Sequence, residues 1–353
     1  MRASRLLIFV LAATAALGQR SAAQPIAFPL FERYVESLRQ QTGIPGLSAA
    51  IVQGGRIVWE AGLGSRDVEG ALPATPDTPY PIGDLTQTLA TVLLGECADS
   101  GRLDIDAPIG QWSTSIPEAS ATVRQVLAHA SDSAARGGFR YDRGRFAALT
   151  LVAEACLGGE YRRLIADGVL DRLGMAESVP ARDLEDAGEA ARHRFDAADS
   201  ARYAAVIRRM AVPYRVDRAG RATRSEYGAR GLDAASGVIS TVRDLARYDA
   251  ALDAGDLLRP EVVGIAWQNA LATNGTPLPT GLGWFVQTYN GQRLVWHFHM
   301  APDAYSALIL KVPGRDLTLI LLANSDGLSA SFSLADGDVT KSLFAKAFLG
   351  LFL

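Results

Sequence analysis

Residues 283–299 read GWFVQTYNGQRLVWHFH, and they carry the clearest structural signal in the chain. The dipeptide Asn290-Gly291 divides them, and it accepts the positive φ angles that a two-residue hairpin turn requires. The flanking segments 283–289 and 293–299 are rich in aromatic and β-branched residues, as strands usually are. The stretch therefore predicts an antiparallel β-hairpin near the C-terminus.

Further strands are predicted at both ends of the chain. The segments 305–312 and 317–324 follow the hairpin, and 47–53 and 56–62 flank Gly54-Gly55 near the N-terminus. Early and late strands joined by short turns indicate one antiparallel sheet.

Apolar residues recur at helical spacing in much of the remaining sequence. The spacing predicts helices at about 29–42, 85–97, 122–129, 144–157, 160–173, 241–252 and 337–350. The segment 180–235 has weak periodicity and is predicted to be irregular or loosely helical. The expected fold class is α/β plus α: an antiparallel sheet flanked by N- and C-terminal helices, with a large helical insertion. The sheet part is expected at about 24–75 and 280–353, and the insertion at about 76–279.

Composition and charge exclude several functions. The 353 residues contain 35 Lys plus Arg and 38 Asp plus Glu, which gives a formal net charge of −3. No basic field is available to hold a nucleic acid through its phosphates. The two cysteines, Cys97 and Cys156, exclude a zinc knuckle and allow at most one disulfide. Because Cys97 lies on an apolar helix stripe and Cys156 near the end of another helix, two buried thiols are slightly favoured over a bond.

The first 23 residues resemble a secretory signal peptide. Arg2 and Arg5 precede an apolar run from Leu6 to Leu17, and Ser21-Ala22-Ala23 suits a cleavage site. The run is too short to span a bilayer as a helix. We therefore expect a mature chain at 24–353 that is secreted or periplasmic and has no membrane span.

Several short phrases in the sequence resemble those of one enzyme family. They are Gly46-Leu47-Ser48-Ala49-Ala50-Ile51-Val52, Gly101-Arg102-Leu103-Asp104-Ile105-Asp106-Ala107-Pro108-Ile109, Thr122-Val123-Arg124-Gln125-Val126-Leu127-Ala128-His129, Leu173-Gly174-Met175, Ser240-Thr241-Val242-Arg243-Asp244-Leu245-Ala246 and Gly281-Leu282-Gly283-Trp284. With the order of elements, they make nearly the whole mature chain similar to the serine β-lactamase and penicillin-binding-protein family, in its class C and esterase-like branch.

The resemblance implies three catalytic motifs: Ser-x-x-Lys at the start of a helix, Tyr-x-Asn, and Lys or His-x-Gly on a strand. The corresponding places here read Asp84-Leu85-Thr86-Gln87, Tyr141-Asp142-Arg143 and His297-Phe298-His299. Nucleophile and base are thus replaced by Asp84 and Gln87.

A different alignment does not restore the missing motif. The chain has three lysines, Lys311, Lys341 and Lys346, and the residues three positions before them are Leu308, Asp338 and Leu343. No Ser-x-x-Lys therefore exists anywhere in the sequence, and acyl transfer by the serine mechanism lacks both of its partners.

Each remaining residue has a structural and a functional interpretation. Asp84 and Gln87 fit a capping box that opens the following helix, and the alternative for Asp84 is a nucleophilic or general-base carboxylate. Tyr141 is either a packed aromatic or part of a binding site. The resemblance implies that Arg143 points into the cleft between the sheet and the helical insertion, where its guanidinium would suit a carboxylate ligand.

The four histidines also have two interpretations. His297 and His299 project from one face of a strand, where His299 would crowd the substrate edge or contribute to ligand binding. With Asp84 they could form a metal site, but we expect no metal and no other cofactor. His129 and His193 are expected to be structural.

The leading hypothesis is an exported pseudoenzyme that keeps the family scaffold and a cleft for a small molecule or a peptide. The alternative is a hydrolase that uses Asp84, Tyr141 and His297 by a non-serine acid/base or metal-assisted route. A third class is a purely structural or partner-binding protein.

Overall fold

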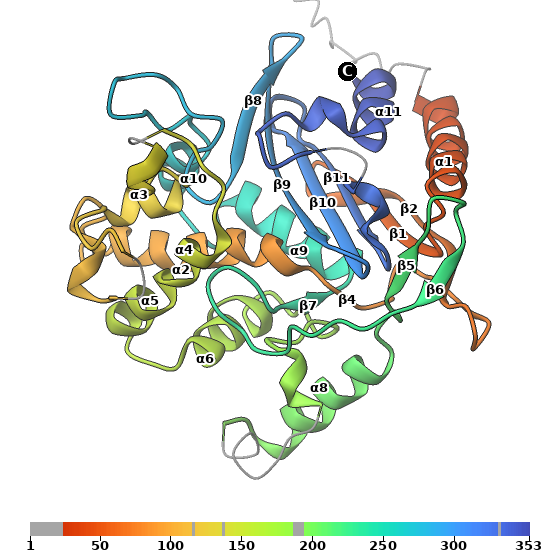
Figure 1. The fold of residues 1–353 in the computed structure, drawn as a ribbon, viewed down its shortest axis with the longest axis horizontal. Coiled ribbons are helices and arrows are strands. Elements are labelled where there is room, and N and C mark those ends of the chain that lie inside the picture. Colours follow the sequence, from red (N-terminus) through yellow and green to blue (C-terminus); the bar gives the residue numbers. More distant parts are fainter. Residues whose placement is uncertain (1–23, 115–116, 136–137, 186–193, 331–332) are drawn as a thin grey trace, which may run out of the picture.

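The centre of the structure, a computed structural model, is a seven-stranded antiparallel sheet (Figure 1). The residues described are 24–114, 117–135, 138–185, 194–330 and 333–353, so the expected signal peptide at 1–23 and His193 lie outside them. The strands in spatial order are β3 (Leu72–Pro73), β2 (Arg56–Asp67), β1 (Gly46–Gln53), β11 (Leu317–Ala323), β10 (Tyr305–Val312), β9 (Gln292–Ala301) and β8 (Phe285–Tyr289).

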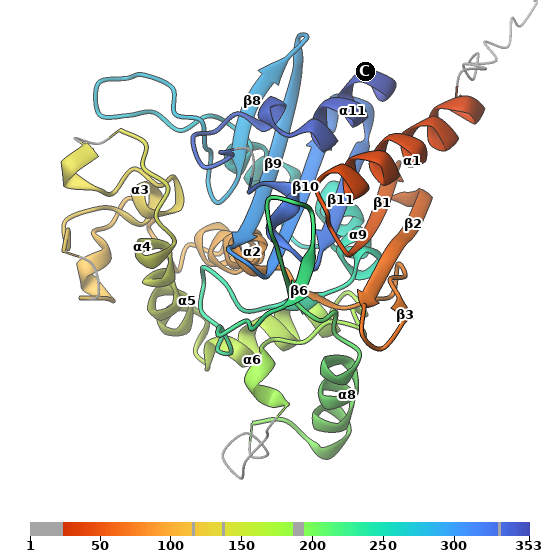
Figure 2. The same cartoon turned by 45° about the vertical axis from the view of Figure 1, so that its right-hand side comes forward.

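The two terminal helices cover one face of the sheet. Helices α1 (Gln24–Gln41) and α11 (Leu343–Phe352) lie side by side in both views (Figures 1 and 2). Phe31 of α1 packs edge-on against Phe348 of α11, with 6.1 Å between the ring centroids. The apolar tail of the chain therefore completes a core layer, because burial of these rings stabilises the fold.

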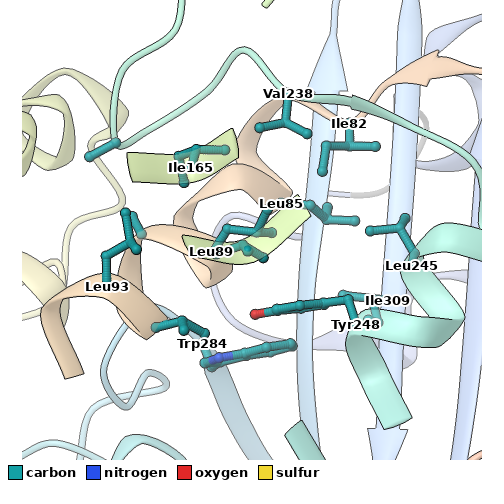
Figure 3. Packing of buried hydrophobic residues seen from close by; sticks show 14 of the residues in the cluster. Ile82, Leu85, Leu89, Leu93, Ile165, Val238, Leu245, Tyr248, Trp284 and Ile309 are labelled. Atoms are coloured by element: carbon teal, nitrogen blue, oxygen red, sulfur yellow. The ribbon is translucent and has the colours of Figure 1, made fainter. Parts of the chain in front are cut away.

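The opposite face of the sheet packs against the helical part. Helices α2 (Thr86–Asp99) and α9 (Val242–Ala254) belong to the same buried cluster as residues of β1, β10 and β11. Figure 3 shows Leu89 of α2 among the side chains of Ile165, Tyr248 and Trp284. The start of α2 is thus held between sheet and helices.

The remaining elements of the helical part are short. They include the 3₁₀ turn η1 (Gly83–Leu85) and the helices α3 (Val123–Leu127), α4 (Arg143–Ala147), α5 (Leu149–Leu157), α6 (Tyr161–Ile165), α8 (Ala197–Arg208) and α10 (Pro260–Ala266). Two short strand pairs also belong to this part. Strand β4 (Tyr80–Pro81) pairs with β7 (Ile239–Ser240), and β5 (Tyr214–Val216) pairs with β6 (Ala222–Arg224).

The predicted fold class is confirmed, since an antiparallel sheet flanked by terminal helices encloses a helical insertion in sequence. Details differ where tertiary contacts override local pattern. The predicted helix at 160–173 is α6 followed by a π-helical stretch at Ala166–Asp171. The segment 180–235 contains α8 and the β5–β6 hairpin, and α10 was not predicted.

The expectation of two free thiols was wrong. Cys97 and Cys156 form a disulfide, with their Cα atoms 6.3 Å apart. The bond joins the end of α2 to the end of α5, and these two helices pack together. The apolar pattern of each helix does not show which other helix it packs against, so the sequence did not reveal the bond. None of the helices in the described ranges is long and apolar enough to cross a membrane.

Candidate functional site

Three chain segments far apart in sequence meet beside the first turn of α2. The turn η1 and α2 carry Asp84 and Gln87, β9 carries His297 and His299, and the segment entering α4 carries Tyr141 and Arg143. The β4–β7 pair holds the chain just before η1 (Figure 1), and η1 lies against β9. The structure thus brings all six predicted site residues together. We call them, with His129, the Asp84 cluster.

Asp84 is an ion-paired buried residue rather than a helix cap. Its carboxylate oxygens lie 3.0 Å from Nε of Arg143 and 3.5 Å from Nδ1 of His299, and the Tyr141 hydroxyl donates to it at 3.2 Å. Burial opposes its ionisation, but the His299 and Arg143 side chains outweigh burial and hold the pKa of Asp84 below its usual value. The site therefore holds a carboxylate anion.

The predicted capping box at residues 84 and 87 was wrong. Helix α2 begins at Thr86, its N-cap residue is Leu85, and no side chain caps it. The carboxylate of Asp84 points to its ion partners, because a 3₁₀ turn precedes the helix and moves Asp84 out of the N-cap position. A capping box does exist at Thr122 and Gln125, at the start of α3.

Gln87 links the aromatic members of the cluster. Its Nε2 donates to the Tyr141 hydroxyl at 3.1 Å, and its Oε1 lies 3.0 Å from Nε2 of His129 and 3.3 Å from Nε2 of His297. The backbone N–H of Asp142 donates to Nδ1 of His129, which leaves Nε2 of that ring as the donor to Gln87. The Gln87 amide thus forms a hydrogen-bonding bridge between Tyr141 and the two histidines.

His129 is the member of the cluster that the sequence did not identify. It was expected to be structural because no His, Cys or paired carboxylate lies near it in sequence, yet its ring contacts Gln87 and lies 4.5 Å from the Tyr141 ring, centroid to centroid. No local spacing signals this contact, since the partners are separated by 42 and 12 residues.

Burial keeps Tyr141, His129 and His297 uncharged at neutral pH. Burial, with the nearby His297, lowers the pKa of His129 to about 3, and burial lowers the pKa of His297 to about 4. Burial and the Asp84 carboxylate raise the pKa of Tyr141 well above its usual value. The Tyr141 phenol therefore keeps its proton, and neither His129 nor His297 is an imidazolium at pH 7.

We expect stability to fall as the pH falls from about 6.5 to about 4. The unfolded chain binds a proton at each histidine near pH 6.5, whereas the folded chain does so only near the lowered pKa values of His129 and His297, so acid favours unfolding. Each group contributes on the order of 3 kcal/mol over this window. Urea denaturation at a series of pH values measures the slope, and His297→Gln should flatten it. An unchanged slope in that variant would contradict the assignment.

His299 fills the space between β9 and η1. The side chain is buried with 0% exposure, and a Cβ at Gly83 would lie 2.2 Å from three atoms of the imidazole ring. Gly83 has a φ of +48°, so glycine suits this position for two reasons. The ring lies against the backbone next to Asp84, at the strand edge where the resemblance places a substrate.

Arg143 lies at the surface side of the cluster. Its side chain is 48% exposed, and besides Asp84 it donates to Oγ of Ser236 at 2.8 Å. The contact with Ser236, from the loop before β7, was not anticipated from the sequence. The guanidinium bridges α4, η1 and this loop.

The cluster does not form a metal site in the part of the chain that the structure describes, where no group of three His, Cys, Asp or Glu side chains is placed to hold an ion. In the nearest equivalent, which is Asp84 with His297 and His299, the Nδ1 atom of His299 lies 3.5 Å from the Asp84 carboxylate. His297 directs Nδ1 at the carbonyl oxygen of Phe298, 3.0 Å away, and Nε2 at Gln87.

Comparisons with known proteins place this geometry in a family. The family model described as Beta-lactamase matches residues 31–340. The serine beta-lactamase-like protein LACTB of Mus musculus, a mitochondrial protein, is 30% identical over 115 residues, which cover 29% of this chain and 21% of that protein. The chain thus matches about a fifth of the length of that relative. Protein flp of Staphylococcus aureus is 27% identical over 106 residues, which cover 28% of this chain and 21% of that protein.

Solved structures share the fold. The octameric penicillin-binding protein homologue from Pyrococcus abyssi has a TM-score of 0.71 and 21% identity, covering 91% of this chain and 77% of that one. A class C beta-lactamase from Rhodobacter sphaeroides has a TM-score of 0.64 and 18% identity, covering 91% and 98%. The resemblance predicted from the sequence is confirmed. The chain belongs to the beta-lactamase family.

Proposed function

We propose that this chain is an exported pseudoenzyme of the beta-lactamase family. The observation that carries the proposal is the state of the nucleophile place: Asp84 stands where the family has serine, is 4% exposed, and has its carboxylate engaged by Arg143, His299 and Tyr141. A carboxylate enclosed in this way is poorly placed to attack a substrate carbonyl.

The positions of the lysines support the same conclusion. Lys311 is buried in an ion pair with Asp249 of α9, and Lys341 pairs with Asp336. Lys346 lies on α11, which covers the sheet face opposite to α2. The amine that would take a proton from a nucleophile is thus absent from the Asp84 cluster.

Arg143 supports a remaining role in ligand binding. Its half-exposed guanidinium presents a fork of donors that suits the carboxylate of a small molecule or peptide. His299, the other residue expected to bind, is fully buried and is better explained as the group that fills the strand edge.

Export is supported by the disulfide. A bond between Cys97 and Cys156 persists in oxidising compartments and is rare in the cytosol, which agrees with the signal-like sequence at 1–23. The mature chain is therefore proposed to be secreted or periplasmic.

We expect no covalent adduct when the mature protein is incubated with a penicillin, because acyl transfer needs a nucleophile and a positioned base. Intact-mass measurement tests this, with an active class C β-lactamase as positive control under the same conditions. An added mass that maps to a residue of the Asp84 cluster would overturn the pseudoenzyme proposal.

The rival function, a hydrolase without serine, has one observation in its favour: Asp84 and Tyr141 are hydrogen-bonded, and Gln87 connects Tyr141 to His297. The test measures hydrolysis of a p-nitrophenyl ester by the parent, by His297→Ala and by Ala201→Leu, which changes an exposed site on α8. If the protein is a hydrolase without serine, the parent and Ala201→Leu hydrolyse the ester and His297→Ala does not. The pseudoenzyme requires equal background rates in all three proteins.

A further inference from the structure

A cavity on the surface of the helical part lies apart from the Asp84 cluster. It has a volume of about 260 Å³ and opens between α2 and α10. Its wall is formed by apolar side chains, among them Leu94, Ala98, Leu127, Leu258, Ile265 and Leu282. An apolar cavity of about 150 Å³ is already large enough to bind benzene, so this one accommodates a larger apolar group.

The interior of the cavity suits hydrocarbon. Thr91 contributes a hydroxyl to the lining, but this group already donates to the backbone oxygen of Gln87 at 2.9 Å. Ile265 at the wall is 51% exposed and extends the apolar lining to the surface. Covering this surface with a nonpolar group would be favourable, since the burial removes apolar area from water.

The mouth of the cavity carries a net negative charge. Its charged lining residues are Asp99, Arg259 and Glu261, and all three are exposed. Arg259 is engaged by Asp99, with its Nε 2.8 Å from a carboxylate oxygen, so the positive charge is already neutralised. Glu261 leaves one negative charge at the rim, which disfavours an anionic head group.

We infer that this cavity is a binding site for a single-chain amphiphile with a cationic head group. The alkyl chain enters between α2 and α10 against Leu94 and Leu258, and the head group stays at the rim beside Glu261. The site is independent of the proposed function. It shares helix α2 with Gln87 of the Asp84 cluster, because Thr91 follows Gln87 by one turn.

The test is isothermal titration calorimetry of the full mature chain with n-octylamine and n-octanoate at pH 7, where both probes are charged. Octylamine is expected to bind about fivefold more tightly than octanoate, since the chains are matched and the head groups differ in sign toward Glu261. Glu261→Gln is expected to bring the two affinities together. Equal affinities in the parent, or tighter binding of octanoate, would overturn the inference.

A filled cavity provides the second arm. Ala98→Leu places a larger side chain in the wall and is expected to weaken octylamine binding at least about tenfold without lowering the denaturation midpoint. Ala201→Leu on α8 is the matched control and should bind like the parent. If Ala98→Leu binds octylamine as the parent does, the probe lies elsewhere and the site is refuted.

Discussion

Alanine at position 83 is expected to lower the free energy of unfolding by about 3 kcal/mol, although it adds a single methyl group. Gly83 has a φ of +48°, a conformation that costs other residues roughly 1 kcal/mol or more. The added Cβ would also lie 2.2 Å from the ring of His299, which is fully buried and cannot move aside freely. Urea denaturation of Gly83→Ala and the parent measures the difference.

Two controls separate the backbone strain from the clash. Gly101 has a φ of +71° with open space around it, so Gly101→Ala reports the strain alone, about 1 kcal/mol. In a His299→Ala background the clash partner is gone, and Gly83→Ala should cost no more than Gly101→Ala does. The expected coupling between residues 83 and 299 is therefore about 2 kcal/mol. Equal costs for Gly83→Ala in both backgrounds would contradict this packing of the ring.

Removing the disulfide is expected to have a similar effect on stability. The double variant Cys97→Ala and Cys156→Ala should be less stable by about 3 kcal/mol, because the bond restrains the unfolded chain across a separation of 59 residues. It also joins α2, which carries Gln87 of the Asp84 cluster, to α5. Thermal and urea denaturation of the mature protein under oxidising conditions provide the measurement.

Reduction of the parent is the control that needs no mutation. Parent protein in dithiothreitol should unfold at the midpoint of the double variant, and the double variant should not respond to the reductant. A parent midpoint that stays the same in reductant, with free thiols confirmed by mass, would show that the bond contributes nothing.

Local sequence pattern predicted the strands well and the polar helical surface poorly. The segments 305–312 and 317–324 correspond to β10 and β11 within one residue, because each alternates between two buried faces and ends at turn residues. Within 180–235, by contrast, α8 buries three large side chains, Tyr203, Val206 and Ile207. So narrow an apolar stripe gives a weak periodic signal, and tertiary packing determines the helix.

The absence of a Ser-x-x-Lys motif was determined by the sequence alone, since the residues three positions before the three lysines are Leu308, Asp338 and Leu343. The surroundings of Asp84 and Gln87 were decided only by the tertiary structure. Gln87 contacts His129 and His297, which are 42 and 210 residues away, and Cys97 bonds a cysteine 59 residues away. Spacing reports which residues share a turn or a hairpin, whereas contacts at these separations form only when sheet and helices pack and exclude water from the polar groups between them.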